Sequence, residues 1–175
     1  MPRKPAKALL CSLLLTAVVG GAWARSSDRN QDMSIDAGKQ SGSFQGDGKT
    51  VLTGGVNVTQ GTLQITSSAA DIYVDGGEIT RAIFTGKQVK MKQQMDDGSW
   101  MDASADRVEY DMKTEIITFI GNYTVTSARG SNRGQKMVYD TKSGNIESGG
   151  DGSRVTTVIK AKNAAPAQPQ PQGKK

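Results

Sequence analysis

The strongest constraint in this sequence is a repeated strand pattern with a glycine at its centre. The segment Val51 to Val74 has a weaker copy from Ile117 to Asp140, and Gly54 corresponds to Gly121, an offset of 67 residues (121 minus 54). In both copies apolar residues recur two apart on either side of the glycine, which is the period of a β-strand. A duplicated strand–kink–strand unit predicts one elongated sheet architecture, with the glycines at bulges or bends.

The first 24 residues have the features of an export signal. A basic start at residues 3–7 precedes an apolar run at 8–19, and small residues lead to an expected cleavage after Ala24. A retained membrane anchor is the alternative, but the run is short for a bilayer span. Cleavage would remove Cys11, the single cysteine, and the chain has no histidine.

Composition divides the rest of the chain into three parts. Residues 25–31 are polar and expected to be flexible, 32–160 suit one domain, and the Pro- and Gln-rich segment 161–175 is expected to be a disordered tail. The net charge of +5 comes from the two ends of the chain. Without the three cations of the signal and four at the C-terminus, 15 basic residues (22 − 3 − 4) face 17 acidic ones, which disfavours a nucleic-acid partner.

Alternation of apolar and polar residues predicts an almost purely β protein with no amphipathic helix. A tight turn at Gln60-Gly61 should join two strands as a hairpin, and Gly-containing turns are expected at 75–77, 96–98 and 143–145. The predicted strands begin near Met33 and then cover 51–59, 62–66, 72–74, 79–85, 88–93, 107–111, 115–126 as the longest, and 154–159.

The sequence argues against catalysis. A mature chain without histidine or cysteine has no Ser-His-Asp arrangement, no thiolate nucleophile and no nitrogen or sulfur ligand for zinc. Asp96 and Asp97 could form a general acid and base pair, but the glycine that follows favours a turn. Asp47-Gly48 and Asp75-Gly76-Gly77 resemble fragments of calcium loops and lack the ligand spacing of one. We therefore expect no enzyme, no metal and no cofactor.

Three segments carry a family resemblance: LTGGVNVTQGTLQI (52–65), FIGNYTVTSARGSNRGQKMVYD (119–140) and RVTTVIK (154–160). Together they resemble the OstA-like family of periplasmic lipopolysaccharide-transport proteins, to which the LptA bridge proteins belong, over roughly residues 31–159. The resemblance implies an incomplete antiparallel β-jellyroll, V-shaped, slightly twisted and open at both ends, with two sheets around an apolar slot.

The same resemblance implies a function in outer-membrane assembly. Family members bind the lipid A acyl chains of lipopolysaccharide and conduct the lipid across the periplasm without making or breaking a bond. They stack on themselves head to tail. The bridge joins an LptC-like inner-membrane protein to an LptD/LptE-like outer-membrane translocon.

Candidate lining residues follow from the alternation, and the resemblance places Met33 and Ile35 on the first strand facing acyl chains. The full set is Met33, Ile35, Val56, Val58, Leu63, Ile65, Val89, Met91, Val108, Tyr110, Tyr123, Val125, Met137 and Tyr139. The alternative for each residue is a place in a closed core. For contact with the lipid headgroup Arg81 is a candidate, and Lys87, Lys90 and Lys92 are equally admissible.

The two terminal strands lack the features that normally protect sheet edges. Neither 33–35 nor 155–159 contains lysine or proline, which commonly block edge-to-edge pairing. Unprotected edges suit strand addition between copies in a non-closing filament. The candidate oligomer residues are Met33, Ser34, Ile35, Val155, Thr156, Thr157, Val158 and Ile159.

Two other interpretations remain open at this point. An exported glycan-binding or glycan-processing β domain would use carboxylates alone and should show aromatic sugar platforms. The second interpretation is closer to the family resemblance: the chain would be a related family component, such as the soluble domain of the outer-membrane translocon.

Overall fold

The computed structural model describes residues 26–150 and 152–161, so the expected signal segment and all but the first residue of the expected tail lie outside the described residues. The described part is nearly all β, as predicted. It contains the 3-10 helix η1 (Ser26–Asn30) and the strands β1 (Met33–Ser41), β2 (Gly48–Gln60), β3 (Leu63–Asp75), β4 (Glu78–Gln94), β5 (Trp100–Asp111), β6 (Ile116–Ser127), β7 (Gly130–Asp140), β8 (Ile146–Ser148) and β9 (Thr156–Ile159). None of the described residues forms a helix that is both apolar and long enough to cross a bilayer.

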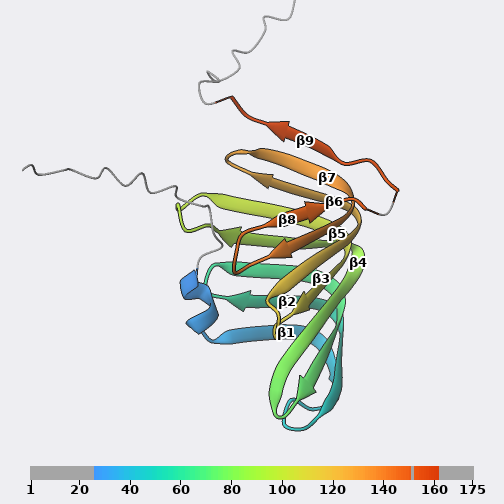
Figure 1. Ribbon diagram of the computed structural model, residues 1–175. Coiled ribbons are helices and arrows are strands. Elements are labelled where there is room, and N and C mark those ends of the chain that lie inside the picture. Colours follow the sequence, from blue (N-terminus) through green and yellow to red (C-terminus); the bar gives the residue numbers. More distant parts are fainter. Residues whose placement is uncertain (1–25, 151, 162–175) are drawn as a thin grey trace, which may run out of the picture.

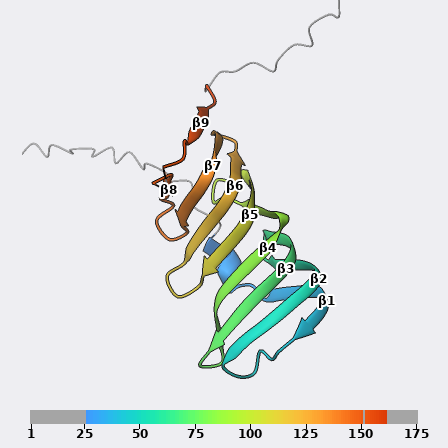
Figure 2. The ribbon, with the colours of Figure 1, turned by 90° about the vertical axis from the view of Figure 1, so that its right-hand side faces the viewer.

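The strands form one open antiparallel sheet. Their order follows the chain from β1 to β8, and β9 pairs with β7 beside β8. Figures 1 and 2 show β1 and β9 at opposite extremes of this sheet. The predicted open, antiparallel all-β fold is confirmed, with one difference: hydrogen bonding is continuous, so the two sides of the V are halves of one folded sheet.

The sheet folds along a line of register shifts that crosses successive strands. We call this the bend line; the shifts lie at Ala37/Lys39, Thr53/Val56, Thr66/Ala69, Thr85/Val89, Ser104/Arg107 and Ile120/Tyr123. Extra residues in a ladder bend the strand locally, and here the bends align. Figure 1 shows the strands turning at the right of the molecule.

The bend line divides the sheet into two walls. Wall A comprises residues 33–37, 56–60, 63–67, 89–94, 100–105, 122–127 and 130–134 with β9; wall B comprises 39–41, 48–53, 69–75, 78–85, 107–111, 116–120 and 136–140 with β8. The hairpins at the far end of each wall form the mouth of the V.

Glycine makes the bend possible where backbones come closest. Gly54 and Gly121, the paired positions of the repeat, have φ of 82° and 77°, a region that side chains disfavour. A Cβ on Gly38 would lie 2.8 Å from the carbonyl oxygen of Gly54. The predicted glycine bends are therefore confirmed.

Three local predictions differ from the structure. The separate strands expected at 79–85 and 88–93 are two halves of the 17-residue β4, and 62–66 and 72–74 are parts of β3. Gly86 and the small residues around Ser68 interrupt the alternation at the bend line without ending the strand. The segment 115–126 is therefore not the longest strand. Residues 26–30, expected to be flexible, form η1.

The apolar core lies between the two walls. Side chains that point inward alternate with outward ones along each strand, as the pleat requires. Buried side chains of wall A, such as Val58 and Met91, belong to one cluster with Phe84 and Phe119 of wall B. This interior is the part of the fold that could hold a ligand.

Candidate functional site

The predicted lining residues all lie in or against the interior. Among the fourteen, only Met33, Ile35 and Tyr110 are half-buried, and they pack on the cluster formed by the others. Contact with a ligand remains a prediction for each of them. The alternation was sufficient to find this face because buried and exposed side chains alternate regularly within each half of a strand, before and after the bend line.

Several interior residues were missed by the sequence analysis. Leu52 and Phe119 are completely buried at equivalent repeat positions, and Ile72, Phe84 and Met101 lie in the same cluster. Leu52 and Phe119 had a signal, because both appear in the aligned repeat. Ile72 and Met101 also sit in alternating segments, whereas the small residues Ala82 and Ala103 give no such signal.

The interior contains almost no charge. Among the residues whose side chains are described, Asp28 is the only buried charged one, with an exposed fraction of 4%. Its carboxylate accepts hydrogen bonds from the Thr62 hydroxyl, at 2.5 Å, and from Gln93 Nε2, at 3.4 Å. Asp28 belongs to η1, which thereby attaches to the wall A rim of the mouth. The other buried polar residues, Thr50, Ser67, Gln93 and Thr141, are uncharged, and the rest of the buried interior is apolar.

At the N-terminal end the walls are in contact. Met33, Ile35 and Val58 of wall A face Ile79 and Tyr110 of wall B across a space of about 10 Å³, enough for about one water molecule. A hydrocarbon chain can enter here only if the walls move apart or side chains rearrange.

At the C-terminal end the walls diverge. An open, largely apolar hollow of about 590 Å³ lies between β9 and β8, lined among others by Val125, Ile146, Val155 and Val158. Ile146 and Ile159 are 52% and 83% exposed. Apolar side chains are therefore accessible to a ligand or to another protein at this end.

The predicted edge strands occupy the two extremes of the sheet. Within the described chain, β1 pairs only with β2 and β9 pairs only with β7. Each strand therefore has one edge without a strand partner among those residues. Val155 precedes β9 and lines the hollow instead of continuing the strand.

Arg81 lies outside the interior. It alternates with the buried Ala82, so its side chain is on the outer face of wall B, where it pairs with Glu109. Burial alone would raise the pKa of Glu109, but hydrogen bonds from Arg81 and Arg107 hold it below its ordinary value. Contact of Arg81 with a lipid headgroup stays a prediction, and this position limits it to a headgroup that reaches the outer face of wall B. Lys90 and Lys92 also face outward, on wall A, because Val89 and Met91 are buried.

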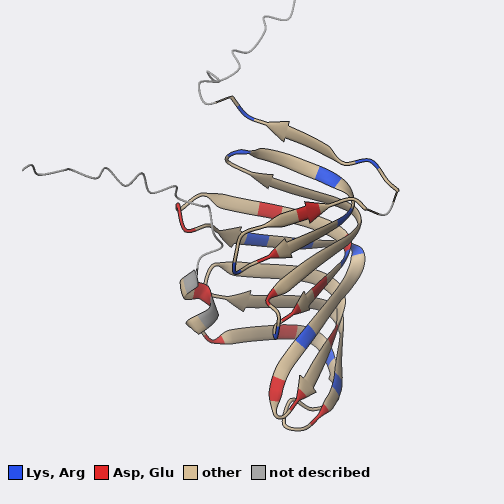
Figure 3. Ribbon diagram, in the orientation of Figure 1, with Lys and Arg blue, Asp and Glu red and all other residues tan. Residues whose placement is uncertain are grey.

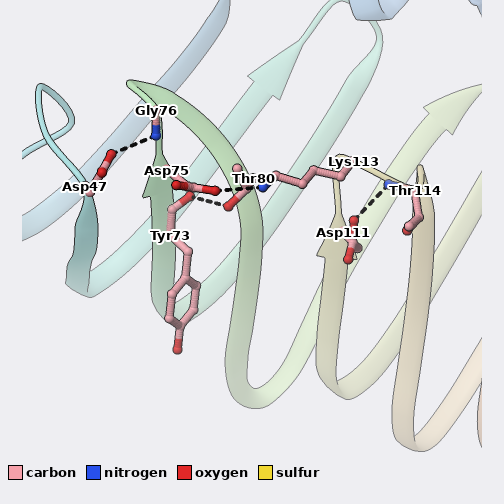
Figure 4. A network of polar contacts seen from close by, with 8 residues as sticks. All are labelled: Asp47, Tyr73, Asp75, Gly76, Thr80, Asp111, Lys113 and Thr114. Atoms are coloured by element: carbon pink, nitrogen blue, oxygen red, sulfur yellow. Dashed lines mark hydrogen bonds and ion pairs between the residues drawn. The ribbon is translucent and has the colours of Figure 1, made fainter.

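The carboxylates considered for catalysis or metal binding serve turns. Asp97 accepts hydrogen bonds from Ser99 N at 2.9 Å and from the Ser99 hydroxyl, and these bonds lower its pKa. Asp47 accepts a hydrogen bond from Gly76 N at 2.7 Å, and Asp75 pairs with Lys113 at 2.8 Å. Figure 4 draws both contacts. No group of three potential metal ligands occurs within the described ranges.

Three comparisons with known proteins are consistent with this architecture. A family model described as LptA/(LptD N-terminal domain) LPS transport protein matches residues 34–145. The lipopolysaccharide export system protein LptA of Escherichia coli K12 is 30% identical over 154 residues, which cover 86% of this chain and 82% of that protein. LptA of Haemophilus influenzae is 32% identical over 145 residues, covering 79% and 82%.

A solved structure supports the fold independently. The crystal structure of LptH from Pseudomonas aeruginosa, described as the LptA homologous periplasmic component of the lipopolysaccharide transport device, superimposes with a TM-score of 0.69. The match covers 77% of this chain and 99% of that chain at 24% identity. At this identity the likeness concerns the fold.

Proposed function

The chain belongs to the LptA/(LptD N-terminal domain) family of LPS transport proteins, and from this premise we propose that it carries lipopolysaccharide across the periplasm by holding the lipid A acyl chains between walls A and B. The observation that carries the proposal is the largely apolar interior of an open, folded sheet, in which Asp28 at the rim is the one buried charged residue among the described side chains. No chemical step is required of the protein in this role.

The physical argument is the cost of moving acyl chains through water. Each buried methylene contributes about 0.8 kcal/mol, so a chain of a dozen carbons needs a continuous apolar surface to stay in solution. Inward side chains of β1 to β7 supply such a surface from Met33 to Val125. Six of the seven methionines, at residues 33–137, lie in or against the apolar cluster between the walls. Their flexible, unbranched side chains can adapt to the shape of a lipid.

Transport across the periplasm requires copies to be joined, and the sheet edges support this step. In the proposal, β9 of one copy adds to β1 of the next, so that the apolar hollow at the C-terminal end continues into the interior of the neighbour. The terminal copies contact an LptC-like protein at the inner membrane and an LptD/LptE-like translocon at the outer membrane. The arrangement is heterologous and does not close on itself.

The test is photo-crosslinking in cells from two neighbouring positions of β1. A photoreactive residue at Ile35, which faces the interior, should form adducts with lipopolysaccharide, whereas one at Ser34, on the opposite face, should not. Ile35→Asp should reduce lipopolysaccharide binding about tenfold or more, while Ser34→Asp leaves it unchanged. Equal labelling from both positions, or protein adducts alone, would contradict the lipid-binding role.

A further inference from the structure

The outer face of wall A carries a depression lined mainly by polar residues. The proposed lipid groove, which is the interior between walls A and B, gives this outer depression no role. The depression measures about 390 Å³ and crosses β3 to β6, with Thr66, Lys90, Ser104 and Thr124 in one cross-strand row and Lys92 beside Asp102 in the next. A second depression of about 330 Å³ shares Thr124 and adds Arg133 and Arg154. The two hollows adjoin at Thr124, and hydroxyl, amide and cationic groups line both.

The cations of this surface differ from those on the other side of the molecule. The five ion pairs found among the described residues all lie on wall B or on the turns at its hairpins, where Lys49, Arg81, Arg107, Lys113 and Lys142 have acidic partners. None of these pairs includes Lys90, Lys92, Arg133 or Arg154. Figure 3 shows basic and acidic segments close together on the lower hairpins, which belong to wall B.

Lys92 illustrates the difference. Its cross-strand neighbour is Asp102, yet the two form no ion pair; the Lys92 ammonium lies over the ring of Trp100, 4.9 Å from its centroid. Trp100 is 42% exposed and starts β5, at the hairpin that forms part of the mouth. An exposed aromatic ring beside cations and hydroxyls is a surface on which a sugar can stack and a phosphate can pair.

The position of this surface suggests its ligand. A lipid whose acyl chains lie between the walls must send its saccharide out through the mouth, and the rim of wall A leads from Trp100 directly into the depression. We propose that the outer face of wall A binds the phosphorylated core saccharide of the lipopolysaccharide held in the groove. Phosphates pair with Lys90, Lys92 and Arg133, and sugar hydroxyls bond to the threonine, serine and Asp102 side chains. This inference rests on the proposed function.

The experiment uses the phosphorylated core oligosaccharide of lipopolysaccharide after removal of its acyl chains, titrated calorimetrically into protein recovered from the periplasm. Wild-type protein should bind it. The double variant Lys90→Glu, Lys92→Glu should bind it with an affinity lower by about tenfold or more. The matched control is Lys113→Glu, Lys136→Glu, which reverses two exposed charges on wall B and should retain wild-type affinity. Circular dichroism verifies that both variants are folded.

A second probe separates the two proposals. Lipid A without core saccharide should bind wild type and the Lys90, Lys92 variant equally, because its acyl chains lie in the groove and its own phosphorylated disaccharide stays at the mouth, short of Lys90 and Lys92. Failure of wild type to bind it would contradict the proposed function. No binding of the oligosaccharide at millimolar concentration, or the same loss in the control, would overturn the outer-face site alone. Removal of the phosphates should weaken binding to wild type, and unchanged affinity would contradict the assigned role of the lysines.

Discussion

The two ends of the groove are built on different principles. At the N-terminal end β1 to β6 run through the bend line, so both walls are supported by the same continuous ladders, and apolar side chains meet between them. At the C-terminal end β7 is followed by two separate short strands, β8 on wall B and β9 on wall A. Their connection contains Gly149, Gly150 and Gly152, all at positive φ.

One polar residue links the divergent strands at the C-terminal end. Asn132 of β7 donates to the Thr157 hydroxyl of β9 at 2.9 Å, and its Oδ1 accepts from Ser148 of β8 at 3.3 Å and from the Tyr123 hydroxyl. Apolar packing closes one end, whereas at the other β8 and β9 are held by their backbone pairing with β7 and by the hydrogen bonds of Asn132. The C-terminal end therefore keeps a defined geometry while its apolar surface remains exposed.

The difference assigns two proposed tasks, association between copies and lipid entry, to different ends of the molecule. Exposed apolar surface on a soluble protein usually marks a contact site, and here it lies beside the free edge of β9. Under the proposed function, the N-terminal end would have to open to accept a hydrocarbon chain, because its cavity holds about one water molecule. Association is thus expected to depend on the C-terminal end, and lipid entry on the separation of packed walls.

The largest effect is expected from charges placed on β9. Val158→Asp with Ile159→Asp should abolish head-to-tail association, with a dissociation constant raised about 100-fold or more, because two carboxylates would be buried in the contact. Both side chains are more than half exposed, so the fold should persist. Sedimentation velocity over a concentration series measures the change. Gln135→Asp, at an exposed position of the neighbouring strand β7, is the control, and equal loss in that variant would contradict the assignment.

A smaller, local effect is expected from Asn132→Leu. The variant loses the links to β8 and β9 and leaves Tyr123 without this acceptor, a cost of about 2 kcal/mol. Amide hydrogen exchange in residues 156–159 should accelerate about 30-fold, since 1.4 kcal/mol corresponds to a factor of ten. Gln135→Leu, an exposed amide of the same strand, should leave β9 protected. Unchanged exchange in β9 would show that Asn132 does not hold this end together.

Much of this architecture could be predicted from the sequence. The two-residue period identified the interior face of each strand, and Gly54 with Gly121 located two points on the bend line. These features are local: a side chain's face depends on its neighbours in the strand, and a positive φ depends on one residue. Arg81 could also have been placed outside, because it alternates with Ala82 and Phe84.

The alignment of the bends could not be predicted in the same way. Whether Gly86 ends a strand or bends it depends on Ser68 in the neighbouring strand, whose backbone nitrogen a Cβ on Gly86 would approach to 3.0 Å. Asn132 and Asp28 are polar residues whose partners lie 9 to 65 positions away in the chain. Such contacts follow from the register of several strands together, which a single sequence pattern does not specify.

The smallest effect is expected from the ion pairs of Glu109 with Arg81 and Arg107 on the outer face of wall B. Glu109 is ionised more readily in the folded protein, because its pKa lies below the ordinary 4.5. It therefore adds stability above pH about 4.5, and this contribution is lost as the pH falls through the folded-state pKa. Glu109→Gln should lower the free energy of unfolding by less than about 1 kcal/mol at pH 7 and by a smaller amount at pH 3, as measured by urea unfolding. Glu147→Gln, an exposed acid outside the ion pairs of the described residues, should show no such difference. If Glu109→Gln lowers the free energy of unfolding equally at both pH values, the charge of Glu109 does not stabilise wall B, and its contribution comes from packing.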